Sequence, residues 1–433
     1  MKNELEHFPS LKYDCLQKRR AYILLLSFLT LFGVCSAYGQ SINEYLILAA
    51  ESNPALKAKF IEYQASLEKV SQVGALSDPQ LSFGFFIKPM ERYAGDQVAE
   101  ISLMQMFPWF GTLGAAKNEA ALMAKAKYEA FIESKTMLFY EVKATWYALY
   151  LLEKEIAITE ENIQILQSLE EIAINRFKSG GTSGGGSMVD VLRVQMETNE
   201  SKNKLALLRD NRQQLAAQFN KLLNRPSSEV VIMPDRITAP MLPVPVAQIP
   251  DSIRQNNPML KMLKMEEEAF LAQEQMNRKM GFPMIGIGLQ YGIFQPRPGN
   301  ESMMNGHDML MPMATVSIPL WRKKYNASVK EAGFMREAVI EQRQEAGNQL
   351  LVSHEEALKD YRDATRRVEL YQQQTVLAQQ ALNILTVQYA TAGSAFEEVL
   401  RMQQQLLDYR LRGLDSIVDQ NIAIAMLERL MGR

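Results

Sequence analysis

The residues best suited to chemistry gather in one run of the chain, residues 303–313, which reads MMNGHDMLMPM. Its methionines and its histidine offer thioether and imidazole ligands, a set that suits soft ions such as copper(I) and silver(I). The sequence therefore predicts a soft-metal contact with these candidate ligands: Met104, Met106, Met303, Met304, His307, Met309, Met311 and Met313. The alternative interpretation is that methionine serves as adaptable apolar filler, in a chain that holds 25 of them.

Catalytic chemistry finds little support elsewhere in the sequence. The chain has three histidines and two cysteines, and it carries no phosphate-binding loop, no zinc-ligand spacing and no nucleophile motif. His354 falls within a predicted helix, where it is either packed or exposed to solvent. The balance of 47 basic and 49 acidic residues gives no basic surface for nucleic acid. We therefore predict that the protein is not an enzyme, holds no cofactor and binds no nucleic acid.

The N-terminus has the pattern of an export signal. Basic residues at 18–20 precede an apolar stretch at 21–34 that is too short to span a bilayer comfortably. Small residues fit cleavage after Gly39, so residues 1–39 are predicted to be removed together with both cysteines. Acylation at Cys35 is an alternative that the preceding residues fit poorly. Beyond this signal no run of 18 apolar residues occurs, so the exported chain is periplasmic, secreted or built into a β-barrel.

Prolines divide the remaining chain into two similar halves. Residues 109–225 and 320–433 contain none, which predicts two long helical regions separated by turn-rich and strand-rich segments. Motifs recur between the halves, as in Asn53-Pro54 and Asn257-Pro258. This tandem duplication predicts a first repeat at 40–225, a proline-rich linker at 226–250 and a second repeat at 251–433.

Each half is predicted to be mainly helical with a small β part, in the order helix, two strands, long helix, helix. Apolar residues alternate with small or polar ones along the strands, as in Leu81, Phe83 and Phe85. Such strands fit a sandwich with the apolar side inward, or an outer-membrane barrel with that side toward lipid. Four strands cannot close a barrel, whereas three chains would supply twelve. The predicted helices are 42–76, 109–177, 188–225, 251–281, 320–390 and 396–433.

The long helices are the most distinctive prediction. Residues 109–177 would form a rod of about 100 Å at roughly 1.5 Å per residue. Two apolar stripes at heptad-like spacing run along it, which suits a helix with neighbours on both sides, as in a closed ring of helices. The two shorter helices of each half together nearly equal the long one in length. Stacked end to end beside it, they would complete a uniform tube wall.

The order of these motifs resembles the TolC-like outer-membrane efflux proteins over essentially all of residues 40–433. In that family a duplicated unit carries an Asn-Pro, a strand hairpin, a proline at the entry to the long helix, and a helix turn with an aromatic, a glycine and an acidic-Val-Leu. The matching residues here are Asn53-Pro54, Asn257-Pro258, Pro108, Pro319, Phe177, Gly180, Asp190-Val191-Leu192, Tyr389, Gly393 and Glu398-Val399-Leu400. The resemblance implies a homotrimer with a 12-stranded barrel in the outer membrane and a 12-helix periplasmic tunnel. It also implies opening on docking of a periplasmic adaptor and an inner-membrane transporter.

The two helix turns are the predicted gate and adaptor-contact sites. The candidate residues are Phe177, Lys178, Gly180, Asp190, Arg193, Tyr389, Gly393, Glu398 and Arg401. Ion pairs among the charged members would hold a closed aperture, while helix capping is the alternative role for the acidic ones. The first turn is longer than its repeat by a glycine-rich insertion, and Ala395 replaces a basic residue that contributes to some gates of the family.

We therefore predict an outer-membrane channel subunit with a large periplasmic part. It would be a passive duct of a tripartite efflux or type I-like export system for small molecules, with copper(I) or silver(I) among the candidate cargoes. The alternative is an exported coiled-coil scaffold without a pore. The duplicated hairpin discriminates between them, because a scaffold needs no strand pair with an apolar face suited to lipid.

Overall fold

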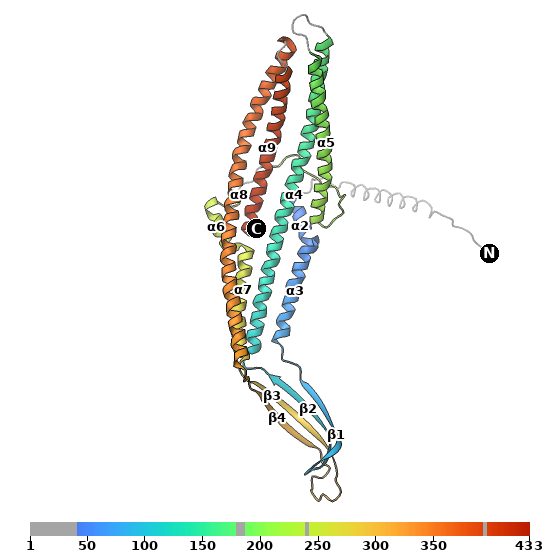
Figure 1. Cartoon of the computed structure of the whole chain (residues 1–433), viewed down its shortest axis with the longest axis vertical. Helices are drawn as coiled ribbons and strands as arrows, with labels where there is room; N and C mark the ends of the chain where they lie inside the picture. Colours follow the sequence, from blue (N-terminus) through green and yellow to red (C-terminus); the bar gives the residue numbers. More distant parts are fainter. Residues whose placement is uncertain (1–40, 179–186, 239–241, 393–395) are drawn as a thin grey trace, which may run out of the picture.

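The computed structural model describes residues 41–178, 187–238, 242–392 and 396–433. The predicted signal at 1–39 lies outside this part of the chain. Helices form a long bundle, and a small sheet lies at one end of it (Figure 1). The predicted fold class, mainly helical with a small antiparallel β part, is confirmed.

The elements follow the same order in both halves. The first half contains α2 (Ile42–Ser52), α3 (Pro54–Gly74), β1 (Gln80–Arg92), β2 (Gly95–Phe107), α4 (Thr112–Lys178) and α5 (Met188–Leu222). The second half contains the short η1 (Val246–Gln248), α6 (Ile249–Asn256), α7 (Pro258–Met280), β3 (Met284–Gln295), β4 (Met309–Ser317), α8 (Arg322–Ala392) and α9 (Phe396–Leu430). With 67 and 71 residues, α4 and α8 are the long rods. Each extends about 100 Å.

The prediction of one continuous helix at the start of each half is wrong. Each of these helices is divided in two at its Asn-Pro motif. Pro54 and Pro258 are the first residues of α3 and α7, where a proline needs no amide hydrogen bond. The preceding asparagines cap these helices: Asn53 Oδ1 accepts from Leu56 N at 3.0 Å, and Asn257 Oδ1 accepts from Met259 N at 3.0 Å.

The same asparagines join the stacked short helices. Asn53 Nδ2 donates to the carbonyl of Leu222, the last residue of α5, at 2.9 Å. Asn257 Nδ2 donates to the carbonyl of Leu430, the last residue of α9, also at 2.9 Å. One side chain therefore satisfies the end of one helix and the start of the next. Figure 1 shows the result, with α3 continuing the line of α5 and α7 continuing the line of α9.

The four strands form a single antiparallel sheet in the order β1-β2-β3-β4. One of its faces, here called the apolar face, carries Phe83, Leu103, Leu289 and Val316, all of which are exposed. On the opposite face, here called the glycine face, Gly84 pairs with Glu100, which pairs with Gly292. An exposed apolar face is not that of an ordinary sandwich strand, whose apolar side is packed inward.

The helices next to the sheet keep the order of the strands. In this part of the bundle α4 packs between α3 and α7, and α8 packs on α7. In the other part α4 packs against α5 and α9, and α8 packs on α9. The wall therefore has two edges, formed by α3 with α5 on one side and by α8 on the other. The same edges end in β1 and β4.

Buried residues concentrate where the short helices meet and toward the helix tips. Tyr45, Trp146 and Phe219 form the centre of the first half, and Ile253 and Leu427 that of the second. None of the helices in the described part of the chain has an apolar stretch long enough to cross a membrane.

Candidate functional sites at the helix tips and on the sheet

At the helix tips, a buried apolar cluster joins the two repeats, and Arg176 adds a charged contact between them. This residue lies near the end of α4, and its guanidinium carbon is 4.4 Å from the centre of the Tyr389 ring on α8. It also donates a hydrogen bond to the Tyr389 carbonyl. The Tyr389 ring is buried and packs on Phe396 of α9, with 4.8 Å between ring centres. A cation therefore bridges the two halves at the tip.

Burial raises the pKa of the Tyr389 phenol, and the nearby carboxylate of Asp190 raises that pKa further. The Arg176 guanidinium acts in the opposite direction. The phenol is therefore neutral at physiological pH and acts as a packing group of the tip.

A second inter-repeat contact lies on the exposed side of the tip. Arg193 of α5 pairs with Glu397 of α9 at 2.9 Å, and Gln404 donates to Glu197 at 2.6 Å. Because the Arg193 and Glu397 side chains are about half exposed or more, water screens this pair. These polar contacts lie beside a buried apolar cluster that includes Val194 of α5 and Val399 of α9.

The acidic gate candidates have local partners. Asp190 Oδ2 accepts from Ser187 N at 3.3 Å, and the Ser187 hydroxyl accepts from Val189 N at 3.1 Å, so Asp190 completes a capping box at the start of α5. Glu398 lies 3.9 Å from Arg401, one turn further along α9. Among the described residues, neither acid forms an ion pair with the other repeat.

The remaining tip candidates divide between exposed and undescribed residues. Phe177 and Lys178 are exposed at the end of α4. Gly180 and Gly393 lie outside the described residues. Sequence reasoning missed Arg176 and Glu397 as partners of Tyr389 and Arg193. The signal available in the sequence was that Arg176 and Glu397 are charged residues next to the predicted helix turns.

The methionine candidates lie at the other end of the molecule. Met104 and Met106 of β2, and Met309, Met311 and Met313 of β4, share the glycine face. The other three candidates, Met303, Met304 and His307, lie in the loop between β3 and β4. The structure therefore brings five of the eight together on one surface.

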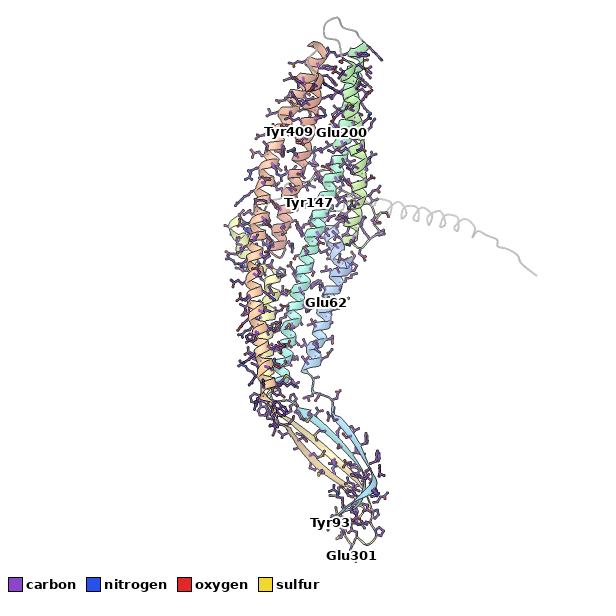
Figure 2. All side chains as sticks on the ribbon, in the orientation of Figure 1. Glu62, Tyr93, Tyr147, Glu200, Glu301 and Tyr409 are labelled. Atoms are coloured by element: carbon purple, nitrogen blue, oxygen red, sulfur yellow. The ribbon has the colours of Figure 1, made fainter. Side chains whose placement is uncertain are left out.

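The β3–β4 loop folds over the first hairpin. Gly306 N donates to the Ala94 carbonyl at 2.8 Å, and Asn300 Nδ2 donates to the Tyr93 carbonyl at 3.1 Å. Figure 2 shows Tyr93 and Glu301 near each other at this end of the molecule. Beneath the loop lies an open hollow of about 510 Å³, lined by Met304, Met309 and Met311 together with Gln290 and Phe294. Within the described residues, no group of three or more His, Cys, Asp or Glu side chains could hold a metal ion.

Aromatic and basic residues gather where the sheet meets the bundle. Trp321 and Phe110 are 82% and 81% exposed, and Trp109 stacks on Phe282 at 5.3 Å between ring centres. Lys323 and Lys324 follow Trp321 after Arg322 and form no ion pair among the described residues. Exposed tryptophan beside lysine is typical of a membrane–water boundary.

This architecture matches known channels. Residues 249–433 match the sequence model of the family described as outer membrane efflux protein. The solved outer-membrane channel OprN superposes with a TM-score of 0.74 at 14% identity, over 90% of this chain and 89% of that one. CusC, described for its transmembrane channel formation, gives 0.74 at 15% identity over 92% and 95%. The outer membrane protein VceC from Vibrio cholerae gives 0.72 at 15% over 90% and 96%. Among curated protein sequences, none matches the chain.

Residues 249–433 thus match the outer membrane efflux protein family, and the described part of the chain has the fold of solved outer-membrane channels. The resemblance predicted from the sequence is confirmed. The family comprises channels rather than enzymes. The matched family and the solved channel CmeC from Campylobacter jejuni are both described as outer-membrane proteins, in agreement with the predicted localisation.

Proposed function

We propose that three copies of this chain form a passive duct through the outer membrane, as part of a tripartite efflux or type I-like export system. The observation that carries the proposal is the shared order of strands and helices, β1-β2-β3-β4 and α3-α4-α7-α8, with the same two edges open in the sheet and in the bundle. Unpaired strand edges are not tolerated in lipid, so each edge needs a partner. Another copy of the chain supplies both.

The edges carry apolar side chains suited to such a contact. On one side Phe334, Val376 and Ile384 are exposed along α8. On the other side Ile61 of α3 and Met196 of α5 are exposed. A contact between two different edges repeats from copy to copy and closes into a ring. Three copies give twelve strands in the sheet and twelve helices at each level of the tube.

The apolar face of the sheet would then face lipid, and the glycine face would line the duct. The belt of Trp321, Phe110, Lys323 and Lys324 would lie at the periplasmic boundary of the membrane, with its lysines reaching toward phosphate groups. This arrangement directs the helix tips into the periplasm, toward the adaptor and the inner-membrane transporter.

We propose that the tips are the gate. The inter-repeat contacts Arg176–Tyr389 and Arg193–Glu397 hold α4 and α5 against α8 and α9. Adaptor docking at the exposed residues Phe177 and Lys178 and at the turns containing Gly180 and Gly393 would exchange these contacts for contacts with the partner. Glu398 and Arg401 would face the neighbouring copy.

A passive duct uses no energy of its own, so its cargo is whatever the partner pump delivers to it. Small molecules are the first candidate cargo. Copper(I) and silver(I) are a second, which the methionines on the glycine face favour. Deletion of the gene tests both, because silver tolerance and dye tolerance can be scored in the same strain. A fall in dye tolerance alone would reject the metals as cargo.

Bilayer conductance with a mass measurement tests the duct. The purified mature protein should be a trimer in detergent and should give discrete conductance steps in planar bilayers. Phe334→Glu should abolish the trimer, because it buries a carboxylate at the α8 edge. The matched control is Val230→Glu, at a residue that is as exposed but lies outside the edge helices. A monomer that does not enter bilayers would instead support the coiled-coil scaffold.

A further inference from the structure

Methionine is segregated to one face of the sheet. Every methionine of β2, β3 and β4 is on the glycine face, namely Met104, Met106, Met284, Met309, Met311 and Met313. The alternate positions of these three strands carry mainly leucine, isoleucine, valine, alanine and aromatic residues, with Gln105 and Pro312, but no methionine. A filler role would place methionine on the apolar face as readily, since that face is the one that needs apolar side chains. Methionine is therefore concentrated on the face of the sheet that would line the proposed duct.

The register of β3 places glycines between the methionines of its neighbours. Gly288 pairs with Met104 of β2 on one side and with Met313 of β4 on the other. Gly286 pairs with Met106, and a Cβ atom on Gly286 would lie 2.6 Å from the Met106 sulfur and 3.2 Å from the Met104 sulfur. The two thioethers therefore converge over a strip of bare backbone that any larger residue would fill.

The groove is nearly free of charge. Glu100 is on the same face, paired with Gly292, and it accepts a hydrogen bond from Gln290 Nε2 at 2.7 Å. The strand positions that pair with the other methionines carry glycine, serine or glutamine, and among the described residues Arg92 is the one basic residue lining the hollow beside Met309 and Met311. Hard cations such as Mg²⁺ prefer several oxygen ligands, whereas neutral sulfur ligands suit monovalent soft ions.

We propose that this methionine groove, defined as Met104, Met106, Met309, Met311 and Met313 over Gly286 and Gly288, binds copper(I) or silver(I) in transit. The inference rests on the proposed duct, because it requires the glycine face to line the passage. Met309, Met311 and Met313 alternate along β4, so their side chains follow each other at roughly 6.8 Å. Such spacing gives a row of weak sites, and an ion can pass from one to the next without being trapped.

Silver binding to the purified trimer tests the groove. Calorimetric titration with silver nitrate in a chloride-free buffer should give binding to the wild-type protein. The variant Met104→Leu/Met106→Leu/Met313→Leu keeps the side-chain volume and should weaken this binding at least tenfold. The control variant Met276→Leu/Met280→Leu removes two methionines of α7 and should bind as the wild type does. Silver X-ray absorption should report sulfur neighbours that the triple variant loses.

Conductance of the same samples separates the two proposals. Trimeric mass and unchanged conductance of the triple variant would show that it is folded, so that its lost silver binding reports on the groove. Equal silver affinity in the triple variant and the wild type would overturn the groove while leaving the duct intact. Silver binding by a wild-type protein that forms no channel would overturn the duct, and the groove would then be a binding site without transport. Repetition with copper(I) under reducing conditions distinguishes the two ions.

Discussion

The two repeats are alike at the Asn-Pro joints, where one short helix meets the next, and they differ at their surfaces. Asn53 and Asn257 occupy equivalent positions, and each links the end of one short helix to the start of another. By contrast, the first hairpin turns within two residues between β1 and β2, whereas the second has a long loop that folds over the sheet. Methionines line the second hairpin more densely than the first. The joints are alike because each must satisfy the same backbone groups at the ends of two helices, whereas the exposed surfaces share no such requirement.

Substitution of the two joint asparagines, one at a time, should have the largest effect on the free energy of unfolding. Asn257→Ala removes two accepted hydrogen bonds and one donated bond from a side chain that is 2% exposed. The loss of the cap and the unpaired Leu430 carbonyl should lower the free energy of unfolding by about 2–4 kcal/mol. Asn53 accepts one such bond and is 8% exposed, so Asn53→Ala should cost less. Denaturant unfolding of the detergent-solubilised protein measures both, and equal costs would contradict the comparison.

Loss of the Arg176 bridge should have an intermediate effect. Arg176→Ala removes the ring contact and the hydrogen bond to Tyr389, together worth about 1–2 kcal/mol. The open fraction of the channel should therefore rise about 5- to 30-fold. Open probability in planar bilayers measures it. The matched control is Arg209→Ala, because the Arg209–Glu160 pair at 2.7 Å lies within the first repeat. A similar rise in both variants would mean that the inter-repeat contact is not the gate.

The pair formed by Arg410 of α9 and Glu161 of α4 should give the smallest effect, and one that depends on pH. The hydrogen bond from Arg410 is the main cause that lowers the pKa of Glu161 below its ordinary value of 4.5. Because the folded state lowers the pKa of this carboxyl, the ionised carboxylate stabilises the fold at pH values above the ordinary pKa. This stabilisation is lost as the pH falls through the lowered pKa.

Arg410→Met should therefore reduce the free energy of unfolding by about 0.2–1 kcal/mol at pH 7, since the pair is partly exposed. At a pH well below 4.5 the two proteins should be equally stable. Unfolding curves at the two pH values provide the measurement. Arg212→Met is the within-repeat control, because Arg212 pairs with Glu153 of the same repeat at 2.6 Å. A difference for Arg410→Met that persists in acid would rule out Glu161 as the titrating partner.

The local features of the fold could be predicted from the sequence because they depend on short-range patterns. Proline-free stretches predicted α4 and α8, and period-two alternation predicted the strands and their two faces. The break at Pro54 was missed although its signal is local, since a proline removes an amide donor and clashes with the preceding turn.

The contacts between repeats could not be predicted in the same way. Arg176 and Tyr389 are 213 residues apart in the chain, and helical periodicity gives the face of a helix but not its axial register against a neighbour. The same holds for the groove. Alternation put Met104 and Met313 on one side of their strands, but only the strand register shows that Gly288 lies between them.

The Asn-Pro joints give the wall a mechanical property. The rods α4 and α8 run without interruption from the sheet to the tips, whereas α5 and α9 stop at a joint where the Asn53 or Asn257 side chain bonds the end of the upper helix. A torque applied to α5 and α9 at the tips can therefore be taken up as rotation at these two joints. The lower helices α3 and α7 would then turn less than the upper ones. Movement of α5 and α9 at the tips would thus reach the sheet less directly than movement of the continuous rods α4 and α8.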